Sequence, residues 1–242
     1  MRDTDADWRA IGATEPFWGV LTTPQYKRQN LNPEQYTAFY ASGLGDIRRI
    51  TSRLEHLTGK PVRVARALDF GCGTGRLSEA MQAFADHVIG FDISPGMLGE
   101  ARRLGRGTVV YCDEMPAGKF GWINSFIVFQ HIPPERGMAI LETLLDRLEP
   151  GGLISLQFVI YRDPPPALVG PGFVALIRRG SWRRAWRLLF PSAPPIGSVL
   201  MYDYDLTRIC AACHRRGIEE LMLVHTNHGG AHGVEVFGRR ND

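Results

Sequence analysis

The feature that most constrains the fold is a glycine-rich segment in which Gly71, Gly73 and Gly75 stand at alternate positions. An apolar run that contains Asp69 ends just before it, and an amphipathic run begins at Thr74. Glycine adopts positive φ without steric cost and lets a ligand approach the backbone closely. The segment therefore predicts a strand, a ligand-binding turn and a helix in direct succession.

Residues 62–159 alternate between short β-branched or apolar runs and longer amphipathic runs. The expected strands are Val64–Phe70, His87–Phe91, Thr108–Cys112, Trp122–Phe129 and Leu153–Val159, and the expected helices are Thr74–Phe84, Pro95–Leu104 and Pro134–Leu148. Gly151 and Gly152 are expected to end the third of these helices. The final segment adds a helix over Leu206–Arg216 and strands over Leu221–His225 and Gly233–Phe237. This alternation predicts an α/β fold with a doubly wound, mostly parallel sheet.

Two segments fall outside the alternation. Residues 1–60 hold Pro16, Phe17 and Trp18, followed by helix-like runs over Glu34–Tyr40 and Asp46–Leu57. The prolines of residues 162–204 interrupt the pattern after the fifth strand. We expect one elaborated domain made of an N-terminal helical arm (1–60), a core (61–161), a Pro/Arg/Trp-rich insertion (162–204) and a closing helix with strands (205–242).

Composition excludes several classes of protein. The 242 residues are 44% hydrophobic and 22% charged, and the net charge of +3 is too small to predict a nucleic-acid partner. Four cysteines do not form a dense disulfide framework, and the acidic, polar start has no apolar run behind it. These features predict a cytoplasmic chain.

The glycine segment does not fit a dinucleotide-binding fingerprint. That fingerprint requires a third glycine at position 76, where this chain has Arg76, and Asp69 would repel a diphosphate. An acid at the tip of a strand suits a ligand with an ammonium group and a sulfonium centre. An NAD-dependent oxidoreductase is therefore disfavoured.

The segment instead resembles motif I of the class I S-adenosylmethionine-dependent methyltransferases, D/E-x-G-x-G-x-G. The chain is similar to that family at four later points: the strand ending at Asp92, the strand ending at Asp113, the segment Ile127–Pro134 and the segment Leu148–Ile154. The resemblance covers about residues 62–160 closely and the C-terminal helix and strands loosely. It implies a seven-stranded sheet and S-adenosyl-L-methionine as cofactor.

The resemblance also implies which residues contact the cofactor. They are Asp69, Gly71, Cys72, Gly73, Arg76, Asp92, Ile93, Met97, Asp113, Glu114, Met115 and Gln130. An acid at Asp92 would accept hydrogen bonds from both ribose hydroxyls. The alternatives are a surface cation for Arg76, a core residue for Met97 and a solvated loop acid for Glu114.

Methyl transfer from a sulfonium is an in-line displacement, and an alcohol acceptor also needs a group that takes its proton. His131 follows the fourth strand and is the first candidate for general base, with His228 as a second. The alternative for His131 is a structural role at the following helix. The N-terminal arm is expected to fold over the cofactor.

Three histidines, His225, His228 and His232, stand together near the C-terminus. They would line the substrate mouth, hold a divalent metal, or form the polar tip of a glycine-rich hairpin. We assign His225 and His232, with Tyr161, to the substrate and assign no metal.

The insertion concentrates arginines and tryptophans, among them Arg183, Arg184 and Arg187. Arginine suits phosphate or carboxylate, and tryptophan suits sugar faces or a lipid interface. Three interpretations stay open: a lid that recognises an anionic acceptor, a helix in transient contact with a membrane surface, and a solvated charged face.

Together these features predict an S-adenosylmethionine-dependent methyltransferase that acts on oxygen of a small molecule or glycan, such as an anionic, nucleotide- or lipid-linked one. The alternatives are N-methylation of a small amine or amino sugar, and a non-catalytic cofactor-binding or interaction subunit. Both a monomer and a homodimer are compatible with the sequence.

Overall fold

The structure is a computed structural model that describes residues 3–105, 107–163 and 196–242. Its helices are α1 (Thr4–Thr14), α2 (Pro16–Val20), α3 (Pro33–Thr58), α4 (Arg76–Met81), α5 (Pro95–Leu104), α6 (Pro134–Asp146) and α9 (Leu206–His214). Its strands are β1 (Val64–Phe70), β2 (Ala85–Phe91), β3 (Val110–Cys112), β4 (Phe120–Ser125), β5 (Leu148–Arg162), β6 (Leu221–His228) and β7 (Ala231–Arg239). Short 3-10 turns lie at Pro24–Tyr26, Arg28–Asn30 and Phe129–His131.

All seven strands form one sheet in the order β3-β2-β1-β4-β5-β7-β6. The first five are parallel to their neighbours, whereas β7 runs antiparallel between β5 and β6. The predicted doubly wound, mostly parallel seven-stranded sheet is confirmed. The strand order reverses beside β1, where β1 and β4 are neighbours, and ligands of such sheets bind at the carboxyl ends of the strands at this point.

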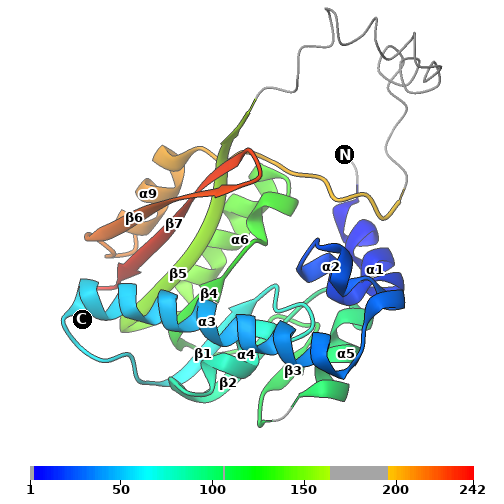
Figure 1. The fold of residues 1–242 in the computed structure, drawn as a ribbon. Helices are drawn as coiled ribbons and strands as arrows, with labels where there is room; N and C mark the ends of the chain where they lie inside the picture. The colour runs from blue at the N-terminus through cyan, green and yellow to red at the C-terminus, as the bar shows by residue number, and fades with distance from the viewer. Residues whose placement is uncertain (1–2, 106, 164–195) are drawn as a thin grey trace, which may run out of the picture.

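Helices cover both faces of the sheet (Figure 1). On one face α3 and α4 bury Ile47, Leu54 and Met81 against Ala67 and Trp122. The other face is covered by α6 and α9, whose buried side chains include those of Leu141, Leu144, Ile209 and Cys213. Because both faces are buried, the central strands are apolar on both sides, and this is why they appear in the sequence as continuous apolar runs.

The two helical runs expected at Glu34–Tyr40 and Asp46–Leu57 are one helix, α3, which crosses the sheet in Figure 1. Asn32 caps its start by accepting from the N–H groups of Glu34 and Gln35. Gly43, which lies between the two expected runs, has a packing role: a Cβ on Gly43 would lie 2.2 Å from the carbonyl oxygen of Arg76. Gly43 therefore lets α3 approach the start of α4.

Several predicted boundaries are wrong. The helix expected over Thr74–Phe84 is limited to α4, and the strand expected to reach Phe129 ends at Ser125. The helix expected to end at Gly151 and Gly152 already ends at Asp146, because Leu148 pairs with Phe120 as the first residue of β5. The residues before Pro33 form α1 and α2, which the sequence analysis did not delimit.

Within the part of the chain that the structure describes, no helix is both long enough and apolar enough to cross a membrane.

Candidate functional site

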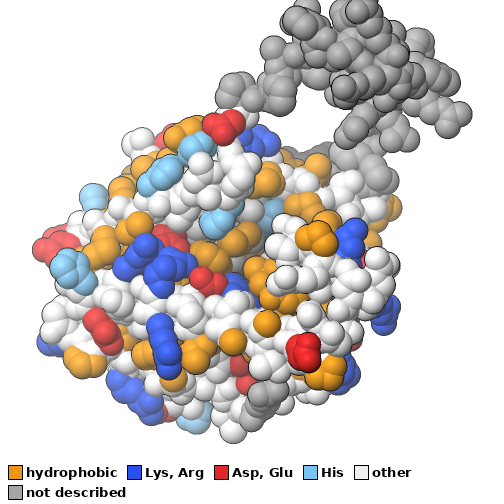
Figure 2. Space-filling model, in the orientation of Figure 1, with side chains coloured by type: hydrophobic (Ala, Val, Ile, Leu, Met, Phe, Trp, Pro, Cys, Tyr) orange, Lys and Arg blue, Asp and Glu red, His pale blue; other side chains and the backbone are white. Residues whose placement is uncertain are grey.

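A cavity of about 340 Å³ opens at the carboxyl ends of β1, β2 and β4. The space-filling view in Figure 2 shows the surface hollowed between α3, the β6–β7 hairpin and the region of α1 and α2. Its wall includes the glycine segment after β1, the residues after β2 and the loop after β4. The cavity therefore lies at the reversal of strand order, as the topology predicts.

The glycine segment forms the part of the wall that follows β1. Gly71, Gly73 and Gly75 have φ values of 75°, 55° and 80°, a region that other residues rarely adopt. A Cβ on Gly71 would come within 2.5 Å of the Val128 side chain, and one on Gly75 would come within 2.2 Å of the Tyr111 hydroxyl. Both the turn and its close contacts therefore require glycine.

Asp69 lies at the end of β1 and is 2% exposed. Its carboxylate accepts hydrogen bonds from Ser78 Oγ at 2.6 Å and from Asn124 Nδ2 at 2.9 Å. Burial raises the pKa of Asp69, and the hydrogen bonds from Ser78 and Asn124 oppose that rise. The side chain borders the cavity and is held in one orientation.

Asp92 follows β2 and holds the glycine segment in place. Its carboxylate accepts from the N–H of Gly73 at 2.9 Å and from the N–H of Ser94 at 2.8 Å. Burial raises the pKa of Asp92 to about 6, although both backbone hydrogen bonds act against this rise. A partly exposed carboxylate at a cavity wall is suited to accept further hydrogen bonds from ligand hydroxyls.

Arg76 begins α4 and is 3% exposed, so the interpretation of Arg76 as a surface cation is wrong. Its Nη1 donates to Asp46 Oδ2 at 2.6 Å and to Ser42 Oγ at 3.1 Å. Its Nε is buried without a hydrogen-bond partner among the described residues, although Arg76 borders the cavity.

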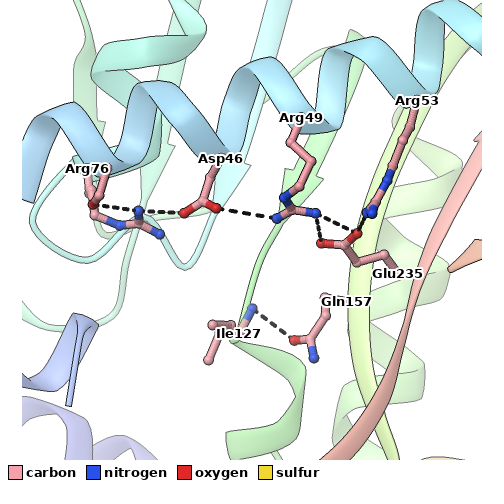
Figure 3. A network of polar contacts seen from close by, with 8 residues as sticks. Asp46, Arg49, Arg53, Arg76, Ile127, Gln157 and Glu235 are labelled. Carbon is pink, nitrogen blue, oxygen red and sulfur yellow. Dashed lines mark hydrogen bonds and ion pairs between the residues drawn. The ribbon is translucent and has the colours of Figure 1, made fainter. Parts of the chain in front are cut away.

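The pairing of Arg76 continues along α3 as a network of charged side chains (Figure 3). Asp46 is 3.4 Å from Arg49, and Arg49 Nη1 lies 2.7 Å from Oε1 of the buried Glu235 on β7. Arg53 also pairs with Glu235. The network contains three guanidinium groups and two carboxylates, so it carries one unbalanced positive charge.

The loop after β4 contains the backbone strain of this site. Ile127 has a φ of 59°, which is costly for a β-branched residue. Its N–H donates to Oε1 of the buried Gln157 at 3.1 Å, as Figure 3 shows. This conformation directs Phe126, Ile127 and Val128 to the cavity wall.

His131 lies in the turn after that loop and borders the cavity at 7% exposure. Its Nδ1 is 2.7 Å from the carbonyl oxygen of Leu200. A carbonyl can only accept, so Nδ1 carries the proton and Nε2 keeps its lone pair. Burial lowers the pKa of His131 to about 4, and the ring is therefore neutral near pH 7.

Gln130 lies behind His131 rather than in the cavity wall. Its Nε2 is 3.2 Å from His131 Nε2, and its Oε1 is buried without a partner among the described residues. With Nδ1 protonated, His131 Nε2 accepts this hydrogen bond from the Gln130 amide, so an acceptor hydroxyl would have to take the place of that amide.

A group of residues that was not predicted from the sequence closes the cavity from the side of α1 and α6. Thr4, Asp5 and Trp8 of α1 border the cavity, and the Trp8 ring centroid is 4.8 Å from that of His131. Arg136 of α6 also borders it and pairs with Asp5. Placement of these residues depends on tertiary contacts between distant segments, so no local pattern indicates it.

The histidines near the C-terminus form a hairpin with Gly229 and Gly230 at its tip, as one of the alternatives proposed. His232 stacks on Tyr161 and lies 3.2 Å from His225 and 3.0 Å from Asp163. None of these residues borders the cavity. Within the described ranges, no three His, Cys, Asp or Glu side chains are arranged to hold a metal ion.

His228 lies nearer to the cavity. Its ring is 6.3 Å from that of Phe126, which borders the cavity. Burial lowers the pKa of His228, and the positive charge of Arg49 lowers it further.

The structure brings most of the predicted cofactor-binding residues together with His131. Those that border the cavity are Asp69, Gly71, Cys72, Gly73, Arg76, Asp92, Ile93, Met97, Met115 and His131. Asp113 and Glu114 are exposed and do not border it. Arg183, Arg184 and Arg187 lie outside the described residues. The individual roles of all these residues stay predictions.

Known proteins share both the sequence pattern and the fold. A family model described as a methyltransferase domain matches residues 40–219. The ubiquinone biosynthesis O-methyltransferase of Paraburkholderia xenovorans is 35% identical over 109 residues, which are 41% of this chain and 44% of that protein. Its counterpart from Xanthomonas oryzae is 30% identical over 144 residues, 53% of this chain and 59% of that protein. The chain thus matches about half the length of these curated relatives.

Solved structures resemble the whole chain at lower identity. Magnesium protoporphyrin IX methyltransferase from Synechocystis, with bound SAH, has a TM-score of 0.63 and 21% identity over 99% of this chain and 100% of that chain. The N-methyltransferase NodS from Bradyrhizobium japonicum, also in complex with S-adenosylhomocysteine, has a TM-score of 0.57 and 14% identity over all of both chains. At these identities the likeness shows the fold.

The sheet order, the glycine segment and the acid after β2 define a class I S-adenosylmethionine-dependent methyltransferase. The family match covers well over half of the chain, and the chain belongs to the methyltransferase domain family.

Proposed function

We propose that this methyltransferase binds S-adenosyl-L-methionine against Asp92 and Arg76 and methylates a hydroxyl oxygen of a small molecule or glycan, with His131 as the proton acceptor. The observation that carries the proposal is the state of His131: a buried, neutral imidazole at the cavity wall whose Nε2 is the acceptor nitrogen and is paired with the Gln130 amide, which an acceptor hydroxyl would replace. The O-methyltransferase relatives support oxygen as the acceptor atom.

The cavity fits the cofactor in shape and in donor groups. The glycine segment presents backbone rather than side chains, and Asp92 offers a partly exposed carboxylate to the ribose hydroxyls. The unpartnered Nε of Arg76, with the unbalanced charge of its network, suits the methionine carboxylate. When bound, the cofactor supplies an electrophilic methyl group on a sulfonium centre.

The chain's own residues align the acceptor and take its proton. Phe126 and Val128 add apolar side chains to the cavity wall, and these exclude water that would compete with the acceptor. The acceptor oxygen would take the methyl group as the sulfur–methyl bond breaks and S-adenosylhomocysteine leaves, and the hydroxyl proton would pass to His131 Nε2. The imidazolium that forms is stabilised by the Leu200 carbonyl, which fixes the ring through Nδ1.

The test uses S-adenosylmethionine labelled with ¹³C in its methyl group, incubated with the protein and small-molecule extracts of cells that express it. NMR of the products distinguishes a methyl carbon on oxygen from one on nitrogen. We expect an O-methyl product, and an N-methyl product would contradict the proposal.

His131→Asn tests the proton acceptor with the same assay. We expect turnover to fall about 100-fold or more, the usual contribution of a general base. His87→Asn is the matched control, since His87 is exposed on β2 and does not border the cavity, and its turnover should stay near that of the wild type. Unimpaired turnover of the His131 variant would exclude His131 as the base.

The proposal also includes a cytoplasmic location and an acceptor other than nucleic acid. The small net charge of +3 supports the second point.

A further inference from the structure

Helix α1 presents two of its side chains to the half of the cavity that contains His131. Asp5 and Trp8 are three residues apart, so they lie on the same face of the helix, and both border the cavity. One supplies a carboxylate and the other a flat aromatic ring. No strand of the sheet contributes either group.

The carboxylate of Asp5 is bound by Arg136 in a fork geometry. Arg136 Nη1 donates to Asp5 Oδ1 at 2.6 Å, and Nη2 donates to Oδ2 at 2.7 Å. Two parallel bonds of this kind are how arginine recognises carboxylates in general. Arg136 lies in the first turn of α6, five positions after His131.

Arg136 is also the cation on this side of the cavity. The cavity wall contains two cations among the described residues, Arg76 and Arg136. Arg76 is buried in the network along α3, whereas the Arg136 side chain is 43% exposed and its partner Asp5 is 21% exposed. A half-exposed ion pair contributes little free energy, so a competing carboxylate is able to displace Asp5.

The ring of Trp8 covers the proposed proton acceptor. Its centroid is 4.8 Å from that of His131, at an interplanar angle of 58°. An acceptor hydroxyl that reaches His131 Nε2 must lie in this region. Trp8 therefore places an aromatic ring beside His131, and Asp5 places a carboxylate beside Arg136.

We propose that α1 is a mimic of the acceptor, and that the acceptor is an aromatic hydroxy acid whose carboxylate displaces Asp5 from Arg136 while its hydroxylated ring takes the place of Trp8 beside His131. This inference rests on the proposed function, because it uses His131 as the neighbour of the hydroxyl. It adds the substrate class and assigns Arg136 as a binding residue.

The test measures binding rather than turnover, so it can fail independently of the proposed function. Calorimetry on the full chain saturated with S-adenosylhomocysteine compares two probes, 3,4-dihydroxybenzoate and the uncharged 3,4-dihydroxybenzamide. We expect the wild type to bind the acid more tightly than the amide.

Asp5→Asn removes the competing carboxylate and should tighten binding of the acid by about twofold to fivefold, in the range of an exposed ion pair. Asp3 caps α1 through the N–H groups of Asp5 and Ala6, and the substitution leaves these bonds in place. Arg136→Gln should weaken the acid about tenfold or more and leave the amide within about twofold.

Glu135→Gln is the matched control. Glu135 is also on α6 but does not border the cavity, and the substitution breaks its ion pair with Arg208 of α9. Both probes should bind to this variant as they bind to the wild type. The proposal is overturned if the ratio of the two affinities is the same in wild type, Asp5→Asn and Arg136→Gln. It is also overturned if neither the wild type nor Asp5→Asn binds the acid.

Discussion

The two halves of the cavity are built in different ways. The cofactor half comes from residues 69–97, a single stretch of β1, α4, β2 and the start of α5. The acceptor half combines α1, the loop after β4, the first turn of α6 and the carbonyl of Leu200. The first half depends on local backbone geometry, whereas the second depends on contacts between segments that are distant in the sequence.

The forces that hold the two halves also differ. In the cofactor half, Asp92 is bonded to the backbone N–H groups of Gly73 and Ser94, so the glycine segment and the acid fix one another. In the acceptor half, a half-exposed ion pair between Asp5 and Arg136 links α1 to α6, while Ile11 and Gly12 pack α1 against its neighbours. The carboxylate of the cofactor half is therefore fixed by backbone donors, whereas that of the acceptor half can exchange its partner.

This difference explains what the sequence could predict. Asp69, Gly71, Gly73 and Asp92 were predicted correctly as neighbours at one edge of the sheet, because parallel strands bring their carboxyl ends together. Trp8 was missed, because an aromatic residue in a short helix carries no local sign of which cavity it will cover.

The conformation of the loop after β4 could not be predicted from the sequence either. The run from Trp122 to Phe129 is apolar throughout and predicts one strand, yet it ends at Ser125 because Ile127 adopts a positive φ held by Gln157. Such strain is maintained by a distant side chain, and a β-branched residue is a poor indicator of it.

The largest expected effect comes from Asp92→Ala in the cofactor half. Loss of the carboxylate removes the acceptor of two backbone hydrogen bonds and, under the proposed function, the partner of the ribose hydroxyls as well, so S-adenosylhomocysteine should bind about 100-fold more weakly or not at all. Calorimetric titration measures this. Asp86 is an exposed acid on β2, the strand before Asp92, and the Asp86→Ala variant should bind the ligand as the wild type does.

A smaller effect is expected from pH. Burial places the pKa of Asp92 at about 6 in the free protein, and ligand hydroxyls that donate to the carboxylate favour its ionised form. Binding must then release a proton below pH 6, so affinity for S-adenosylhomocysteine should fall about tenfold from pH 7 to pH 5. If the Asp92→Asn variant shows the same fall, the carboxylate is not its cause.

The smallest effect is expected from Arg76→Lys, which keeps the charge but removes Nε. S-adenosylhomocysteine should bind about fivefold more weakly, since a point charge replaces a directed donor. Methylthioadenosine lacks the carboxylate, and its affinity should not change. Equal losses for both ligands would show that Arg76 acts through the fold rather than on the carboxylate.

The separation of the two halves is tested most directly by the affinity of the His131→Asn variant for S-adenosylhomocysteine, measured by calorimetry. Because His131 belongs to the acceptor half, the account predicts an affinity within about twofold of the wild type, together with the loss of turnover. A loss of ligand binding as large as that of Asp92→Ala would contradict it.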